Sequence, residues 1–146
     1  MNIVFVCTGN TCRSPMAEAI AKKVFEGKNI EAEIISRGLS GAFPSPASSN
    51  SRIVVDEMGL SLDGFISHPL TYEDIEWADI VITMTKAHKT AVAGACLEKD
   101  TDVYTLAEAA GEDADVSDPF GGDVEIYRRC AYQIKEYIEK IADRLV

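Results

Sequence analysis

The chain has 146 residues, the usual size of one domain, so we expect residues 1–146 to fold as a single unit. Its hydrophobic fraction of 47% and charged fraction of 26% are typical of globular proteins and exclude disordered and fibrous classes. Lys and Arg number 14 against 24 Asp and Glu, and the net charge of −10 argues against nucleic acid or an anionic membrane as a partner. An anionic substrate would therefore need a local positive site.

Strands and helices alternate in the predicted order of elements. In chain order we expect a strand over 2–6, a helix over 15–27, a strand over 31–36, a helix opened by Ser45 and Pro46 and ended by Gly59, a short helix capped over 71–74, a strand over 79–84, a helix over 86–96, a strand over 103–106 and a helix over 123–145. Ser14 and Pro15 suit the N-cap and first position of the first helix. This order predicts an α/β fold with a four-stranded parallel sheet, helices on both faces, and a ligand site at the carboxyl ends of the strands.

Location and cofactors are predicted from what the sequence lacks. The first residues, MNIVFVC, do not resemble a signal peptide, and no run approaches the roughly 18 apolar residues of a membrane span, so we expect a cytoplasmic monomer. Four cysteines are too few for a secreted disulfide framework. His68 and His88 are far apart in the sequence, and neither a metal nor a cofactor is expected.

A C-x5-R pattern occupies the loop after the first predicted strand. It begins at Cys7, ends at Arg13 and encloses Thr8, Gly9, Asn10, Thr11 and Cys12. Backbone N–H groups of such a loop, at the start of a helix, bind an anion, and an arginine adds two parallel hydrogen bonds to a phosphoryl group. The same field stabilises a thiolate at Cys7, to which Ser14 is placed to donate a hydrogen bond. The residues from Thr8 to Ser14 are thus predicted to bind phosphate.

The pattern alone has a simpler reading, with Cys7 as a buried strand-end residue and Arg13 as a surface charge. Its position between a strand and a helix favours the phosphate loop. Gly9 and Asn10 support this reading because both residue types tolerate unusual backbone dihedrals.

The segment CTGNTCRSPMAEA resembles the signature of the low-molecular-weight protein tyrosine phosphatase family. The similarity extends through ISHPLT, ADIVITM and SDPFGG to the final helix. It implies phosphorylated proteins as substrates, with Cys7 as nucleophile, Arg13 holding the phosphate and Asp118 as general acid. It also implies that Ser36 and His68 brace the loop asparagine.

Asp118 fits this role on chemical grounds as well. Attack of a thiolate on phosphorus expels a leaving group that needs a proton, and a loop carboxylic acid can supply it. An isolated Asp-Pro pair is more often only a turn signal. In the expected mechanism Cys7 attacks, Asp118 protonates the leaving atom, and Asp118 then activates the water that hydrolyses a cysteinyl-phosphate. Arg13 and the loop amides stabilise the transition-state charge without a metal.

Two positions resemble the protein arginine phosphatase branch of the family. Tyrosine phosphatases of the family usually carry a branched aliphatic residue in place of Thr11 and consecutive aromatic residues after the Asp-Pro, whereas this chain has Phe120 followed by two glycines. A hydroxyl near Asp118 suits a guanidinium, which is rich in N–H donors. The alternative is that Thr11 replaces a valine without consequence and the substrate is phosphotyrosine. Arg37, if near the pocket mouth, would either help capture phosphate or oppose a guanidinium.

The other cysteines leave further alternatives. Cys12 is either a small packed residue or a thiol that captures oxidised Cys7 as a disulfide. Cys96 and Cys130 are expected to be core or interface residues on helices. An arsenate reductase would need a further cysteine pair in a mobile segment. A non-catalytic phosphoprotein-binding module would tolerate the loss of Cys7 or Asp118, and both are present.

Overall fold

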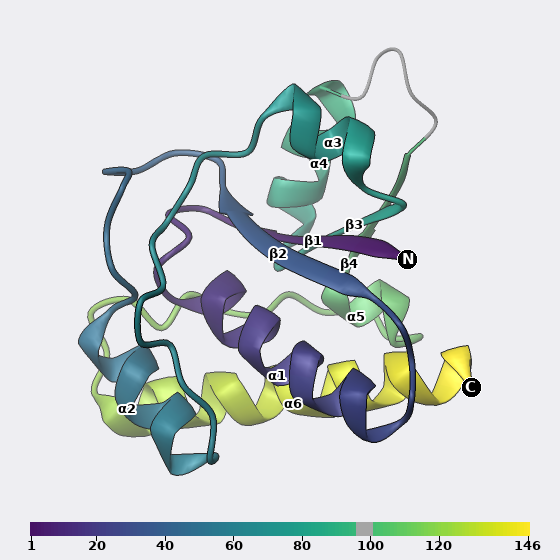
Figure 1. Cartoon of the computed structure of the whole chain (residues 1–146). Helices are drawn as coiled ribbons and strands as arrows, with labels where there is room; N and C mark the ends of the chain where they lie inside the picture. Colours follow the sequence, from purple (N-terminus) through teal and green to yellow (C-terminus); the bar gives the residue numbers. More distant parts are fainter. Residues whose placement is uncertain (96–100) are drawn as a thin grey trace.

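The computed structural model describes residues 1–95 and 101–146. In this part of the chain, four parallel strands form one sheet in the order β2-β1-β3-β4 (Figure 1). The strands are β1 (Asn2–Cys7), β2 (Glu33–Gly38), β3 (Ile80–Thr83) and β4 (Asp102–Thr105). The predicted α/β class and parallel sheet are confirmed.

Helices cover both faces of the sheet, as predicted. They are α1 (Arg13–Gly27), α2 (Ser49–Glu57), α3 (Tyr72–Trp77), α4 (Lys86–Ala95), α5 (Leu106–Ala109) and α6 (Val124–Leu145). In Figure 1, α3 and α4 lie on one side of the sheet, and α1, α2, α5 and α6 lie on the other. The longest helix, α6, packs along α1 and also contacts α2 and α5.

Alternating side chains of β1 supply both halves of the core, because successive residues of a strand point to opposite faces. Ile3 and Phe5 are buried with α1, α2 and α6, whereas Val4 and Val6 belong to a smaller cluster with Val92 of α4. The central strand is therefore apolar on both faces. This burial holds its carboxyl end, and the loop that follows it, in a fixed position.

Two predicted helix starts are wrong. Helix α1 begins at Arg13 rather than after a Ser14 cap, because the Ser14 side chain bonds to Cys7 and Asn10 instead of to the helix backbone. Helix α2 begins at Ser49, and Ser48 caps it by accepting a hydrogen bond from the backbone of Ser51.

The segment predicted to open α2 is extended instead. Pro46 forms an isolated bridge with Ile66, and the backbone N–H of Ser45 donates to Ser67 Oγ. This pairing with a distant segment takes precedence over the local signal of a serine followed by a proline. The extended segment then forms one wall of the pocket described below.

Capping boxes mark two short helices. The one from Thr71 to Asp74 was predicted and opens α3. A second, from Thr105 to Glu108, opens α5, so Leu106 begins a helix rather than ending β4 as predicted.

Strand β2 begins and ends two residues later than predicted. Helix α4 is described as far as Ala95, and Cys96, its predicted last residue, lies outside the described residues.

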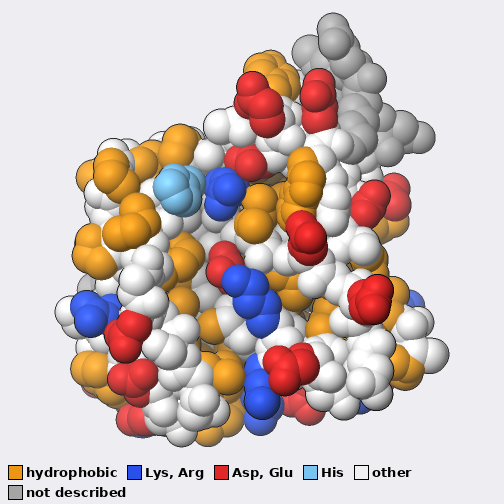
Figure 2. Space-filling view, in the orientation of Figure 1, with side chains coloured by type: hydrophobic (Ala, Val, Ile, Leu, Met, Phe, Trp, Pro, Cys, Tyr) orange, Lys and Arg blue, Asp and Glu red, His pale blue; other side chains and the backbone are white. Residues whose placement is uncertain are grey.

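None of the described helices combines the length and apolarity needed to cross a membrane. Figure 2 shows acidic and basic side chains interspersed over one face of the molecule, without a single large basic patch on it.

Candidate active site

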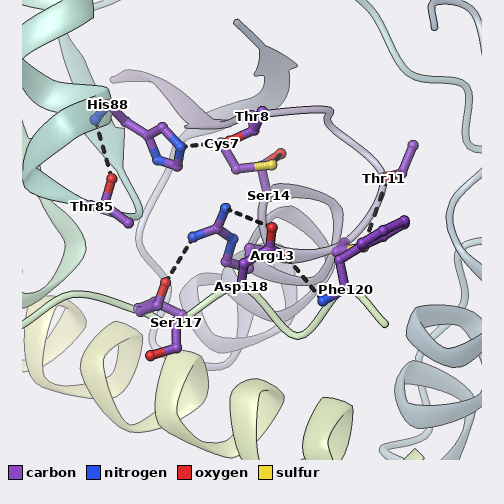
Figure 3. Close-up of polar contacts among 12 residues, drawn as sticks. Cys7, Thr8, Thr11, Arg13, Ser14, Thr85, His88, Ser117, Asp118 and Phe120 are labelled. Carbon is purple, nitrogen blue, oxygen red and sulfur yellow. Dashed lines mark hydrogen bonds and ion pairs between the residues drawn. The ribbon is translucent and has the colours of Figure 1, made fainter. Parts of the chain in front are cut away.

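A pocket of about 360 Å³ opens at the carboxyl end of β1. Strand β1 lies between β2 and β3, where connections leave a parallel sheet in opposite directions and ligands commonly bind. Its lining residues are Cys7, Thr8, Gly9, Thr11, Cys12, Arg13, Gly41, Ala42, Ser45, Asp118 and Phe120. The loop from Cys7 to Arg13 thus meets the Asp118 loop, more than 100 residues away in sequence, at one site (Figure 3).

Asn10 is the internal anchor of this loop. It is fully buried and adopts a left-handed conformation with φ 57°. Its amide donates to Ser14 Oγ at 2.8 Å and to Ser36 Oγ at 3.0 Å, and its Oδ1 accepts from the backbone N–H of His68 at 3.0 Å. A backbone N–H can only donate, so the orientation of the Asn10 amide is fixed. Gly9 has no positive φ, so only Asn10 fulfils the expectation of unusual dihedrals here.

Ser14 links this amide to Cys7. Ser14 Oγ lies 2.9 Å from Cys7 Sγ and accepts a hydrogen from Asn10. Its own hydrogen remains free to be donated, and since a thiolate sulfur can only accept, this contact stabilises Cys7 in its thiolate form. The Ser36 hydroxyl likewise both accepts and donates. It accepts a hydrogen from Asn10 and donates its own to a carboxylate oxygen of Glu18 at 2.8 Å. Glu18 was not predicted from the sequence to belong to this network.

Arg13 is held from the opposite side of the pocket. It is 4% exposed, and its Nη1 donates to the carbonyl oxygen of Val116 at 2.8 Å. Val116 is itself tied to the end of β3 by a backbone bond to Met84. Arg13 Nη2 lies 3.8 Å from Asp118 Oδ2. The guanidinium is thus positioned by backbone, and the remaining N–H groups can face an anion.

Asp118 and Phe120 lie at the mouth of the pocket. The Asp118 side chain is 52% exposed, and its Oδ1 accepts from the backbone N–H of Phe120 at 3.0 Å. The Phe120 ring is 79% exposed. One carboxylate oxygen therefore shapes the turn, while the other faces Arg13 (Figure 3).

Two predicted residues act differently from the expectation. The His68 side chain is exposed, and the brace on Asn10 comes from its backbone N–H instead of its ring. Arg37 pairs with Asp74 of α3 at 2.9 Å and does not line the pocket. Neither suggested effect of Arg37 at the mouth applies, because its charge is neutralised away from the site.

His88 contacts the loop from Cys7 to Arg13 and was not identified from the sequence. Its Nε2 lies 2.9 Å from Thr8 Oγ1. Burial, and then the nearby charge of Arg13, lower the pKa of His88 below its usual value, so the ring is neutral at pH 7. Its position in the helix after β3 could have indicated this contact, because that helix begins at the same edge of the sheet as the loop.

The cysteines differ in their environments. Cys12 lines the pocket, lies 3.4 Å from Tyr127 Oη and donates to Ser48 Oγ at 3.6 Å. Burial, and then the bond with Cys12, raise the pKa of Tyr127 to about 12, so its hydroxyl stays protonated. Burial raises the pKa of Cys130 to about 12, which leaves an unreactive core thiol.

Among the described residues, no cluster of three or more His, Cys, Asp or Glu side chains could hold a metal ion.

Comparison with known proteins matches this architecture along nearly the whole chain. Residues 2–146 match the model of the family described as low molecular weight phosphotyrosine protein phosphatase. The chain is 38% identical to a protein-arginine-phosphatase of Bacillus subtilis, covering 99% of this chain and 97% of that protein. It is 37% identical to the low molecular weight protein-tyrosine-phosphatase PtpB of Staphylococcus aureus, with 98% of each covered.

A solved structure gives the same fold. The YwlE arginine phosphatase, in a cysteine-to-serine mutant whose active-site serine is phosphorylated, superimposes with a TM-score of 0.94 at 37% identity, covering 99% of this chain and 95% of that one. The matched length and these identities are sufficient to assign the family. The chain belongs to the low molecular weight phosphotyrosine protein phosphatase family and is a phosphatase.

Proposed function

We propose that this phosphatase hydrolyses phosphoarginine in proteins through a cysteinyl-phosphate intermediate. The observation that carries the substrate preference is a hydroxyl, that of Thr11, in the wall of a pocket whose rim has Asp118 and a single aromatic ring, Phe120. Support for the intermediate comes from the related YwlE mutant, in which the active-site serine is phosphorylated.

In the first step the Cys7 thiolate attacks phosphorus, and the bond from phosphorus to the arginine nitrogen breaks. Asp118 donates its proton to the leaving nitrogen. Arg13 and the backbone N–H groups of the loop bind the phosphoryl oxygens, whose negative charge they stabilise in the transition state. The products are a cysteinyl-phosphate and a free arginine side chain.

In the second step the Asp118 carboxylate takes a proton from water as the water attacks phosphorus. The sulfur–phosphorus bond breaks, inorganic phosphate leaves and the thiolate is restored. The hydroxyl of Ser14, held by Asn10, stabilises this leaving thiolate. Each residue thus returns to its starting protonation state after one turnover.

The Thr11 hydroxyl can accept a hydrogen bond from a guanidinium N–H, which a phenol ring does not offer. A substrate without this N–H leaves the Thr11 hydroxyl without a hydrogen-bond partner and is therefore disfavoured. A branched aliphatic side chain at this position would instead pack against an aromatic ring. Thr11 therefore favours phosphoarginine over phosphotyrosine.

We expect Thr11→Ile to lower the ratio of kcat/KM for phosphoarginine to that for phosphotyrosine by at least about tenfold. The ratio is measured with peptides that differ only in the phosphorylated residue. Thr11→Ser keeps the hydroxyl and is the matched control, which should stay close to the wild type. A wild type that strongly prefers phosphotyrosine, with a ratio unaffected by Thr11→Ile, would overturn the proposed specificity.

Asp118→Asn keeps an oxygen for the hydrogen bond to Phe120 but removes the acidic proton. We expect kcat on phosphotyrosine peptide to fall by about 10² to 10⁴, and by less on para-nitrophenyl phosphate, whose leaving group needs little protonation. Asp113→Asn is the control, since Asp113 is exposed, pairs with Lys86 and does not line the pocket. Equal losses on both substrates would argue against a role as proton donor.

Phosphotyrosine is the second candidate substrate. Phe120 favours it, because an exposed ring at the mouth can stack on a phenol. The two relatives compared above carry different names at nearly equal identity, so the peptide comparison decides between the substrates.

Regulation by oxidation is a further proposal. A sulfenic acid formed on Cys7 by peroxide would condense with the Cys12 thiol, releasing water and forming a disulfide. Mass spectrometry of peroxide-treated protein tests this directly. An oxidised protein without a link between the two residues would exclude it.

A further inference from the structure

His88 is a buried titratable residue that the mechanism above does not use. It lies in the first turn of α4, is 8% exposed, and its backbone N–H donates to Thr85 Oγ1 at 3.1 Å. Its Nε2 reaches Thr8 Oγ1 at 2.9 Å. In Figure 3 the ring approaches Thr8 from the side opposite Phe120, next to Cys7.

The surroundings of His88 determine which ring nitrogen carries the hydrogen. Nδ1 is buried and has no hydrogen-bond partner within residues 1–95 and 101–146. A buried N–H without an acceptor is rarer in proteins than a buried acceptor without a donor. Burial, and then the cation of Arg13, also disfavour an additional hydrogen on the ring, since both lower the pKa of His88. The hydrogen is therefore on Nε2, which donates to Thr8 Oγ1.

This direction leaves the hydrogen of the Thr8 hydroxyl free. Thr8 Oγ1 accepts from His88, and no acceptor for its own hydrogen is found among the described residues. Thr8 lines the pocket directly after Cys7. The arrangement parallels that on the other side of the sulfur, where Asn10 donates to Ser14 and Ser14 donates to Cys7.

We propose that His88 is a positioning residue, which holds the Thr8 hydroxyl so that its hydrogen is donated to the phosphoryl group of the bound substrate. The inference rests on the proposed phosphatase chemistry but not on the choice between phosphoarginine and phosphotyrosine. Hydrogen bonds to a charged group are worth roughly a tenfold to hundredfold effect on binding or rate. The bond is strongest in the transition state, where charge accumulates on the phosphoryl oxygens.

The test uses the complete chain with para-nitrophenyl phosphate, a substrate that does not depend on the peptide preference. His88→Phe fills the space without an N–H, whereas His88→Gln places an amide N–H near the position of Nε2. We expect His88→Phe to lower kcat/KM by about tenfold or more and His88→Gln to retain most of it. Thr8→Val should lose as much as His88→Phe, and Thr8→Ser, which keeps the hydroxyl, should lose clearly less than Thr8→Val.

The double variant separates positioning from a structural role. If His88 acts through Thr8, adding His88→Phe to Thr8→Val costs little further activity. Multiplied losses in the double variant, or equal activity of His88→Phe and His88→Gln, would overturn the proposal. So would a Thr8→Val variant as active as the wild type.

A second measurement does not require turnover. The inhibition or dissociation constant of inorganic phosphate is measured for Thr8→Val and Thr8→Ser, after circular dichroism melting has shown that both are folded. Weaker phosphate binding by Thr8→Val alone supports the Thr8 contact, and equal binding by both contradicts it. A wild type without phosphatase activity would count against the proposed function instead.

Discussion

Cys7→Ser is expected to lower turnover by a factor on the order of 10⁶, the size of loss seen when a catalytic nucleophile is removed from a hydrolase. A serine hydroxyl at this position would keep the hydrogen bond to Ser14 but is a far weaker nucleophile than a thiolate. The rate is measured with para-nitrophenyl phosphate and with phosphorylated peptides. The loss should be common to all substrates, because the same atom attacks phosphorus in each.

Cys130→Ser is the matched control for this result. Cys130 is buried in α6 with its pKa raised to about 12, so its thiol is protonated and outside the reaction. Its replacement should leave turnover close to that of the wild type. Retained activity in Cys7→Ser, or an equal loss in Cys130→Ser, would contradict a nucleophilic role for Cys7.

Arg13→Lys is expected to lower kcat/KM by about 10³, although the positive charge is kept. Arginine offers a planar fork of N–H donors, so it can bond the carbonyl of Val116 and still give parallel hydrogen bonds to a phosphoryl group. Lysine has a single charged centre and cannot do both in this geometry. Contributions of this size are known for arginines that stabilise a transferring phosphoryl group.

Arg37→Lys provides the comparison for Arg13→Lys. Arg37 pairs with Asp74 away from the pocket, so the same exchange there should change kcat/KM little. Steady-state kinetics of both variants, with circular dichroism to show that both are folded, complete the test. A mild effect at Arg13 would mean that charge alone binds the phosphate.

The sheet and the position of the loop from Cys7 to Arg13 were predictable because their signals are local. Apolar runs rich in β-branched residues mark β1 and β3, and the spacing of Cys7 and Arg13 between a strand and a helix indicates an anion site. The capping box that opens α5 was equally local, with Thr105 and Glu108 at the required spacing, and was missed.

The support of the loop depends on contacts distant in sequence, which local patterns do not contain. Ser36 reaches Asn10 because β2 pairs with β1 in a register that places Ser36 beside Phe5. His88 reaches Thr8 because α4 follows β3 at the same edge of the sheet. The extended segment at Pro46 likewise depends on a bridge to Ile66, so its helix signal was misleading.

In the proposed reaction a phosphoryl group passes from arginine to the side chain of residue 7. The most direct measurement incubates Cys7→Ser with matched phosphoarginine and phosphotyrosine peptides and locates any acquired phosphoryl group by peptide mass spectrometry. We predict a phosphoryl group on residue 7, formed faster from the phosphoarginine peptide. A phosphoryl group that appears only at other residues, or that forms faster from the phosphotyrosine peptide, would contradict the account.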